Sequence, residues 1–283
     1  MTSRYRINHT SRYEYDRAVS ASFNEVRLSP VETAWQTPLE TTLEADPATW
    51  KFRYTDYWGT QVRVFEALAP HGALDVRATS LVEVDIARRP MPDVDMGWSA
   101  VRTDAVRDRF YEFLTHTPAT QPPSEIAEIA DRLAADNGPH DAALAISAAV
   151  HDAMTYDQGS TGVHTLAAEA WAERRGVCQD YAHLVVGALR HVGLPTRYVS
   201  GYLHPASDPG IGVVTTGESH AWVEWWLGEW AAHDPTNSAD VGERHVMIGA
   251  GRDYSDVPPI KGIVAGSHAV TGLSVLVDLV RLA

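Results

Sequence analysis

Hydrophobic periodicity changes twice along the chain, and these two changes limit the folds that the chain can adopt. In residues 1–88, runs such as YRINHTSRYEYD, SASFNEVRLSP and DVRATSLVEVDI alternate apolar and polar side chains, as half-buried strands do. After the Pro-rich ARRPMPDVD, the segments SAVRTDAVRDRFYEFL, SEIAEIADRLAADNG and DAALAISAAVHDAM follow a helical period, and alternation returns from Pro195 onward. Helices that precede a second group of strands predict an α+β fold and not a parallel sheet of βαβ units.

This order divides the chain into three regions. We expect residues 1–88 to form a small antiparallel β domain, sandwich-like, in which DYWGT is a turn between two strands. Residues 89–140 are interpreted as a linker with helices that lead into the core, and residues 141–283 as an α+β core. A chain of 283 residues is long enough to bury a hydrophobic core in one large domain or two ordinary ones.

The charge and cysteine content exclude several classes of protein. The net charge is −14, and Lys51 and Lys261 are the only lysines, so the cationic patch needed for nucleic acid or an anionic membrane surface is not expected. A single cysteine cannot form an internal disulfide. The first residues lack the apolar core of a signal peptide, and no run approaches the length of a membrane span. We therefore expect a cytoplasmic protein that binds neither nucleic acid nor membranes.

The one cysteine lies in GVCQDYAHLVVGALRHVG, residues 176–193. Helical spacing of the apolar side chains indicates a helix whose first turn contains Cys178, and Gly193 ends it. There the free N–H groups and the positive end of the helix dipole favour a thiolate and could hold a developing oxyanion. The alternative is a buried cysteine that acts as a small apolar residue. This stretch alone favours the buried cysteine over the nucleophile.

A second group of residues supplies a base for such a nucleophile. SHAWVEWWL is followed by a tight Leu-Gly-Glu turn and then by EWAAHD, which predicts a β-hairpin. His220 and Asp234 lie at nearly equal distances from this turn, so we expect them to be direct or diagonal neighbours across the two strands. An aspartate that accepts a hydrogen bond from the imidazole would fix its tautomer and stabilise an imidazolium.

These segments resemble a known family. RRGVCQDYAHLVVGALRHVGLPTRYVSGYL, SHAWVEWWLGEWAAHDPTN and GRDYSDVPPIKG resemble the core of bacterial transglutaminase-like proteins, part of the papain-like cysteine fold superfamily. FNEVRLSP and DYWGTQV resemble the β-rich N-terminal region of one branch of that family. The resemblance implies a helix-borne cysteine packed on an antiparallel sheet that carries the histidine and the aspartate, preceded by a small antiparallel β domain.

The resemblance also implies roles. Cys178 matches the nucleophile, His220 the general base and acid, and Asp234 the residue that orients the histidine. The implied chemistry is acyl transfer from a peptide or protein amide through a thioester, resolved by water in a protease or amidase and by an amine in a transglutaminase. We expect hydrolysis. The alternatives are a protein-glutamine transglutaminase and a non-catalytic protein-binding module that retains the fold.

Cofactors and metals are not expected. The animal transglutaminases have calcium sites, but no acidic loop in this chain resembles a calcium-binding pattern such as the EF-hand. Zinc would need clustered ligands, and no CxxC or HExxH spacing occurs. His183 is expected to be structural, because it lies about one and a half turns from Cys178. The pattern does not orient His245 or His268.

Four residues are secondary candidates for substrate binding. Gln179 and Asp180 follow the nucleophile, although an acidic residue in a first helical turn is also an ordinary partner of the helix dipole. Arg252 lies in the GRDY block and could pair with an acid in the cleft or form a surface ion pair. Trp222 belongs to a tryptophan cluster that packs the hairpin, and its ring could also form part of the cleft wall.

Overall fold

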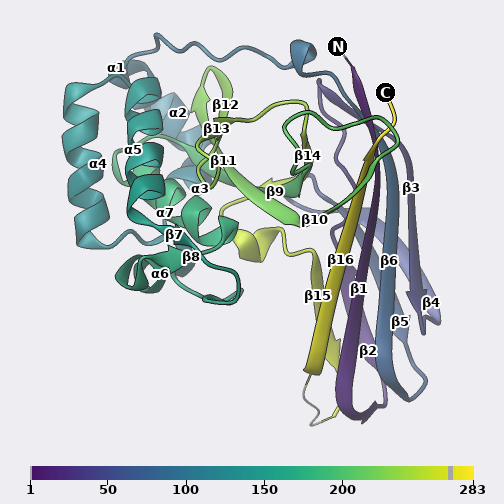
Figure 1. Ribbon diagram of the computed structural model, residues 1–283. Helices are drawn as coiled ribbons and strands as arrows, with labels where there is room; N and C mark the ends of the chain where they lie inside the picture. The colour runs from purple at the N-terminus through teal and green to yellow at the C-terminus, as the bar shows by residue number, and fades with distance from the viewer. Residues whose placement is uncertain (1, 267–269) are drawn as a thin grey trace.

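A computed structural model of the chain describes residues 2–266 and 270–283. A β-sandwich lies on one side of the molecule and an α+β core on the other (Figure 1). The fold class therefore agrees with the prediction: the core is transglutaminase-like, and a β-rich region precedes it. His268 lies outside the described residues.

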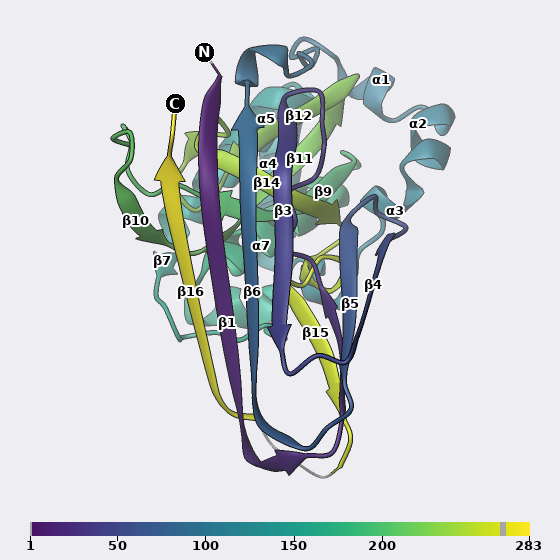
Figure 2. The ribbon, with the colours of Figure 1, turned by 90° about the vertical axis from the view of Figure 1, so that its right-hand side faces the viewer.

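The sandwich consists of two antiparallel sheets that pack face to face (Figure 2). The larger sheet has the order β10-β16-β1-β6-β3, and the smaller has the order β15-β2-β5-β4. The nine strands are β1 (Ser3–Val19), β2 (Ser22–Val26), β3 (Gln36–Asp46), β4 (Trp50–Thr55), β5 (Gln61–Ala67), β6 (His71–Val84), β10 (Val214–Gly217), β15 (Ile260–Val264) and β16 (Val270–Arg281). Phe65 of the smaller sheet and Val76 of the larger sheet meet in one buried cluster between them.

The C-terminal strands differ from the prediction that residues 141–283 all belong to the core. β16 pairs with β1 from Tyr5 opposite Arg281 to Tyr15 opposite Val270. β15 pairs with β2, and β10 pairs with β16. Alternation along a strand predicts the strand itself but not the sheet that it joins, because pairing depends on contacts far away in the sequence. Both ends of the chain thus build the sandwich.

The connecting region from residue 85 to 123 contains short helical elements. They are η1 (Ile86–Arg88), α1 (Trp98–Val101), α2 (Asp104–Arg109), α3 (Tyr111–Leu114) and η2 (Pro118–Thr120). The sequence predicted one continuous helical segment over residues 99–114. Thr103 interrupts it, because its side chain accepts a hydrogen bond from the Val106 N–H and caps α2. Phe110 then leaves the helical region, with φ −116°.

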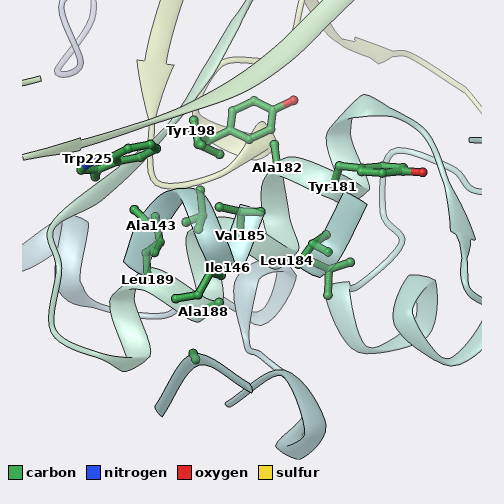
Figure 3. Close-up of a cluster of buried hydrophobic side chains, with 14 of the residues drawn as sticks. Ala143, Ile146, Tyr181, Ala182, Leu184, Val185, Ala188, Leu189, Tyr198 and Trp225 are labelled. Atoms are coloured by element: carbon green, nitrogen blue, oxygen red, sulfur yellow. The ribbon is translucent and has the colours of Figure 1, made fainter. Parts of the chain in front are cut away.

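Helix α7 lies at the centre of the core. The core helices are α4 (Ser124–Asp136), α5 (Pro139–Ala153), α6 (Ala167–Glu173) and α7 (Cys178–His191). Every residue of α7 from Gln179 to Arg190 is buried, which is typical of a helix enclosed on all sides. Figure 3 shows side chains from α7, from α5 and from the sheet, such as Val185, Ile146 and Trp225, gathered in one cluster.

The core sheet carries the histidine and the aspartate of the predicted hairpin. Its order is β13-β12-β11-β9-β14. The remaining elements of the core are β7 (Thr155–Tyr156), β8 (Arg175–Gly176), β9 (Thr196–Leu203), β11 (Ser219–Leu227), β12 (Glu229–Asp234), β13 (Ala239–Asp240), β14 (His245–Gly251) and η3 (Tyr254–Asp256). No helix among the described residues has the length and apolar character needed to cross a membrane.

Sandwich and core share a packed junction. Tyr5, Val277 and Leu279 of the larger sandwich sheet are buried in one cluster with Tyr202 of β9 and Val246 of β14. Glu218 alone separates the end of β10 from the start of β11. The sandwich therefore holds the strand that carries His220 at its beginning.

We expect Leu279→Ala to lower the free energy of unfolding by about 2–5 kcal/mol, because Leu279 is fully buried at this junction. Leu276→Ala is the matched control: Leu276 lies on the same strand with a side chain that is 50% exposed, and its loss should change stability by less than about 1 kcal/mol. Urea unfolding followed by tryptophan fluorescence measures both. Equal effects would show that β16 does not pack into the junction.

Candidate active site

Cys178 begins α7, directly after the extended residue Val177. The carboxylate of Asp180 accepts hydrogen bonds from the Val177 N–H at 2.8 Å and from the Thr161 hydroxyl at 2.6 Å. It therefore caps the helix and fixes the turn that presents the thiol. Gly176 is needed beside this carboxylate, because a Cβ there would lie 2.7 Å from the Asp180 side chain. Cys178 itself is only partly buried.

The hairpin of β11 and β12 brings His220 and Asp234 together. Val223 lies opposite His233 in this pair of strands. Continuing the register places Asp234 opposite Trp222 and diagonal to His220, on the same face of the sheet. His220 Nε2 lies 2.7 Å from Asp234 Oδ2. The contact predicted from the distances to the turn is present.

Asp234 has no exposed surface and is surrounded by donors. Its Oδ1 accepts hydrogen bonds from the backbone N–H groups of Thr236 at 3.0 Å and Asn237 at 3.2 Å. Its Oδ2 accepts from the Asn237 side chain at 2.8 Å, in addition to His220. Burial alone would raise the pKa of Asp234, but the hydrogen bonds from His220, His245 and Asn237 hold it well below its usual range. The residue is therefore a carboxylate at any pH near neutrality.

His245 is a further partner of Asp234 that the sequence did not identify. Its Nε2 lies 3.4 Å from Asp234 Oδ2, and its Nδ1 accepts a hydrogen bond from the Gly242 N–H at 3.1 Å. That bond leaves the proton on Nε2, which faces the carboxylate. Burial lowers the pKa of His245 despite the neighbouring charge, so the ring is neutral. No local signal could have placed it, because β14 reaches Asp234 only through its pairing with β9.

His220 joins Asp234 to the thiol. Burial opposes a charge on the ring, but hydrogen bonds to Asp234 and to Cys178 raise the pKa of His220 to about 10. Asp234 engages Nε2, which leaves Nδ1 as the nitrogen that faces Cys178. The ring therefore carries a positive charge at neutral pH next to the sulfur. An adjacent imidazolium stabilises a thiolate, the form of cysteine that acts as a nucleophile.

His220 opens into a cleft of about 770 Å³. His220 lines it, together with Tyr156 of β7, Glu218, Thr236 and Arg244. Burial, followed by the charges of Cys178 and Glu218, raises the pKa of Tyr156, so its hydroxyl stays protonated beside the thiol. Tyr156 belongs to a strand of two residues, too short to leave a periodic signal in the sequence.

The four secondary candidates lie elsewhere, and none is among the described residues that line the cleft. Trp222 is 1% exposed and packs against His245, so its ring is part of the core. Asp180 is the helix cap described above, and Gln179 is buried with its amide 3.4 Å from the Gly162 carbonyl. Arg252 donates from Nε and Nη2 to Asp256, both at 2.9 Å, which is the surface ion pair considered as its alternative.

Metal-ligating atoms also gather at this site. One atom each from His220, Asp234 and His245 lies within 4.8 Å of the others. The Asp234 oxygens already accept hydrogen bonds from both rings and from Asn237. A divalent cation could bind here only by displacing His220 from Asp234, so the observed arrangement favours the hydrogen-bonded dyad. That the protein needs no metal stays a prediction.

Comparison with known proteins agrees with this geometry. Residues 127–235, which include Cys178, His220 and Asp234, match the transglutaminase-like superfamily. Residues 5–83 match the bacterial transglutaminase-like N-terminal region. An uncharacterized protein of Mycobacterium leprae is 41% identical over 280 residues, which is 99% of each chain. The chain belongs to the transglutaminase-like superfamily.

Two further relatives match this chain over different shares of its length, and one solved structure shares its fold. An uncharacterized protein of Mycobacterium tuberculosis is 31% identical over 301 residues, covering 99% of this chain and 93% of that one. A protein-glutamine gamma-glutamyltransferase of Pseudomonas aeruginosa is 36% identical over 117 residues, covering 38% of this chain and 17% of that one. The crystal structure of a candidate cysteine protease from Cytophaga hutchinsonii has a TM-score of 0.76 at 21% identity, covering 100% of this chain and 92% of that one, and shares the fold.

We expect Cys178 to react with iodoacetamide at pH 6 about tenfold or more faster than free cysteine does. The reason is that the pKa of His220, about 10, keeps the ring charged beside the sulfur at this pH. His220→Ala should remove this advantage. Mass spectrometry of the alkylated chain over time gives both rates. A wild-type rate no higher than that of free cysteine would show that the thiol is not activated.

Proposed function

We propose that the protein is a cysteine-dependent enzyme that transfers the acyl group of a peptide or protein amide to water through a thioester on Cys178. One observation carries this proposal: a hydrogen-bonded chain runs from the carboxylate of Asp234 through His220 to Cys178 and reaches a cleft of about 770 Å³. A cleft of this volume can hold several residues of a peptide.

Acylation follows from the charges of the resting site. The Cys178 thiolate attacks the amide carbonyl carbon, and the negative charge that develops on its oxygen is stabilised by the free N–H groups at the start of α7. The His220 imidazolium then donates its proton to the departing nitrogen, and the C–N bond breaks. Ammonia or an amine leaves, and the acyl group stays on the sulfur as a thioester. Asp234 supports the ring in both protonation states.

Deacylation uses the same groups in reverse. The neutral His220 takes a proton from water as the water oxygen attacks the thioester carbonyl. The C–S bond breaks, the carboxylic acid product leaves, and the thiolate–imidazolium pair is restored. This scheme needs no reactant other than the amide substrate and water.

Transfer to an amine is the second candidate. The similarity to the Pseudomonas aeruginosa protein-glutamine gamma-glutamyltransferase favours it. Acylation would be identical, and an amine nitrogen would replace water in the second step. The difference lies in which acceptor reaches the thioester.

We expect Asp234→Asn to lower kcat by about a hundredfold or more and to move the alkaline limb of the pH–rate profile to lower pH. The carboxylate helps to raise the pKa of His220 to about 10. Without that charge, the ring loses its proton at lower pH and the ion pair is lost there. Asp240→Asn is the matched control, because its side chain is 97% exposed on the neighbouring strand. An unmoved alkaline limb would contradict the role given to Asp234.

A glutamine-containing peptide is incubated with the protein and a labelled primary amine. We expect more of the hydrolysed product, in which the glutamine has become a glutamate, than of the product that carries the labelled amine. Water reaches the thioester without a binding site of its own, whereas an amine acceptor needs one. Mass spectrometry distinguishes the two products, and Cys178→Ala provides the blank. Dominant incorporation of the amine would establish the transglutaminase reaction in place of hydrolysis.

A further inference from the structure

Arg244 brings a positive charge into the catalytic cleft. It lines the same cleft as His220 and is partly buried there. The chain as a whole has a net charge of −14. A substrate anion therefore gains nothing from the overall field of the protein and must be attracted by a local contact.

The backbone on both sides fixes the position of Arg244. Its carbonyl accepts a hydrogen bond from the His204 N–H at 3.0 Å. Its Nη1 donates to the carbonyl of His204 at 3.0 Å and to the carbonyl of Ala206 at 3.3 Å. The guanidinium is thus held by the segment that follows β9, and a ligand would not have to order it. Neutral carbonyls hold the group without cancelling its charge.

The remaining donors of Arg244 are suited to a carboxylate. A guanidinium has five N–H donors, and the two on Nη1 are directed at the two carbonyls. Nε and Nη2 remain, and together they form the fork that binds both oxygens of a carboxylate. In the described parts of the chain, 2–266 and 270–283, no carboxylate forms an ion pair with Arg244. The neighbouring Glu243 accepts instead from the Ser3 hydroxyl at 2.6 Å.

We propose that Arg244 forms a carboxylate-binding subsite, so that the enzyme prefers substrates with an acidic group near the scissile amide. This inference rests on the proposed acyl transfer at Cys178. The carboxylate can belong to an acidic side chain or to a free C-terminus, because both present the same two oxygens.

Glu218 gives the cleft a second, opposite charge. It lines the same cleft, and its Oε1 accepts a hydrogen bond from the Gln158 side chain at 2.6 Å. An acidic substrate is therefore attracted at Arg244 and repelled at Glu218. The preference should depend on the position of the acidic group along the peptide, and not on the total charge of the peptide.

The first experiment measures binding without turnover. N-acetyl-aspartate amide and N-acetyl-asparagine amide are compared for their ability to slow the alkylation of Cys178 by iodoacetamide. We expect the carboxylate compound to protect at a concentration roughly tenfold or more lower than its neutral counterpart, and Arg244→Gln to abolish the difference. Arg132→Gln, an equal change of charge on the exposed face of α4, should leave it intact. Equal protection by the two compounds in the wild type would overturn the subsite.

The second experiment measures specificity. Peptides that differ only in Asp or Asn at each position flanking the amide are compared, each with a free and with an amidated C-terminus. We expect a preference in kcat/KM of roughly tenfold or more for the acidic member at one position, expressed mainly in KM and lost in Arg244→Gln. Arg244→Lys should restore part of it, because it keeps the charge and loses the fork. An equal loss for acidic and neutral peptides would show that Arg244 is structural.

The two failures can be told apart. If no peptide yields a thioester on Cys178 while protection by the carboxylate compound still depends on Arg244, the proposed reaction is wrong and the anion subsite stands. If thioesters form from acidic and neutral peptides alike, with no dependence on Arg244, the reaction stands and the subsite is wrong. Glu218→Gln completes the comparison. In this variant the preference for acidic substrates should still depend on Arg244. If the preference is lost in Glu218→Gln, it comes from Glu218 and not from Arg244.

Discussion

Asp234 is a charged carboxylate with no exposed surface, and burying such a charge costs several kcal/mol unless donors replace the lost water. Two backbone N–H groups and the Asn237 side chain take that role from the turn after β12, and His245 adds a neutral donor from β14. Neutral donors stabilise the anion without neutralising it. The negative charge of Asp234 therefore still attracts a proton on His220, and this attraction keeps the His220 ring charged although it is partly buried.

The position of His220 also depends on elements outside the core sheet. β10 belongs to the sandwich, and β11 begins after one intervening residue. The cluster of Tyr202, Val246 and Leu279 then locks the two sheets together just beside this crossing. Cys178 is fixed independently by α7, which is enclosed by the core. The reacting groups thus come from two separately supported elements, and the β domain takes part in positioning one of them.

The parts of this structure that can be predicted from the sequence are those with a sequence pattern within a few residues. The start of α7 and the hairpin with His220 and Asp234 each have a signal within a few residues, namely helical spacing before a glycine stop and two strands around a tight turn. β3 lacks such a signal, because it is an exposed edge strand with Pro38 at a break in its register. The sheet that β16 joins and the contact of His245 with Asp234 depend on pairing between distant segments, which no local pattern contains.

The residues that carry out the reaction and the residues that would select the substrate also lie on different kinds of element. The nucleophile begins α7, a helix of 14 residues, and its base lies on β11, a strand of 9 residues, and packing in the core fixes the positions of both elements. Part of the cleft wall instead comes from the segment after β9, the turn after β12 and the segment before β14, which include Pro205, Thr236 and Arg244. Loops of this kind can change without disturbing the core. Trp222 illustrates the converse: this aromatic residue lies two positions from the catalytic histidine, yet it is buried packing, because its ring is covered by His245 of β14.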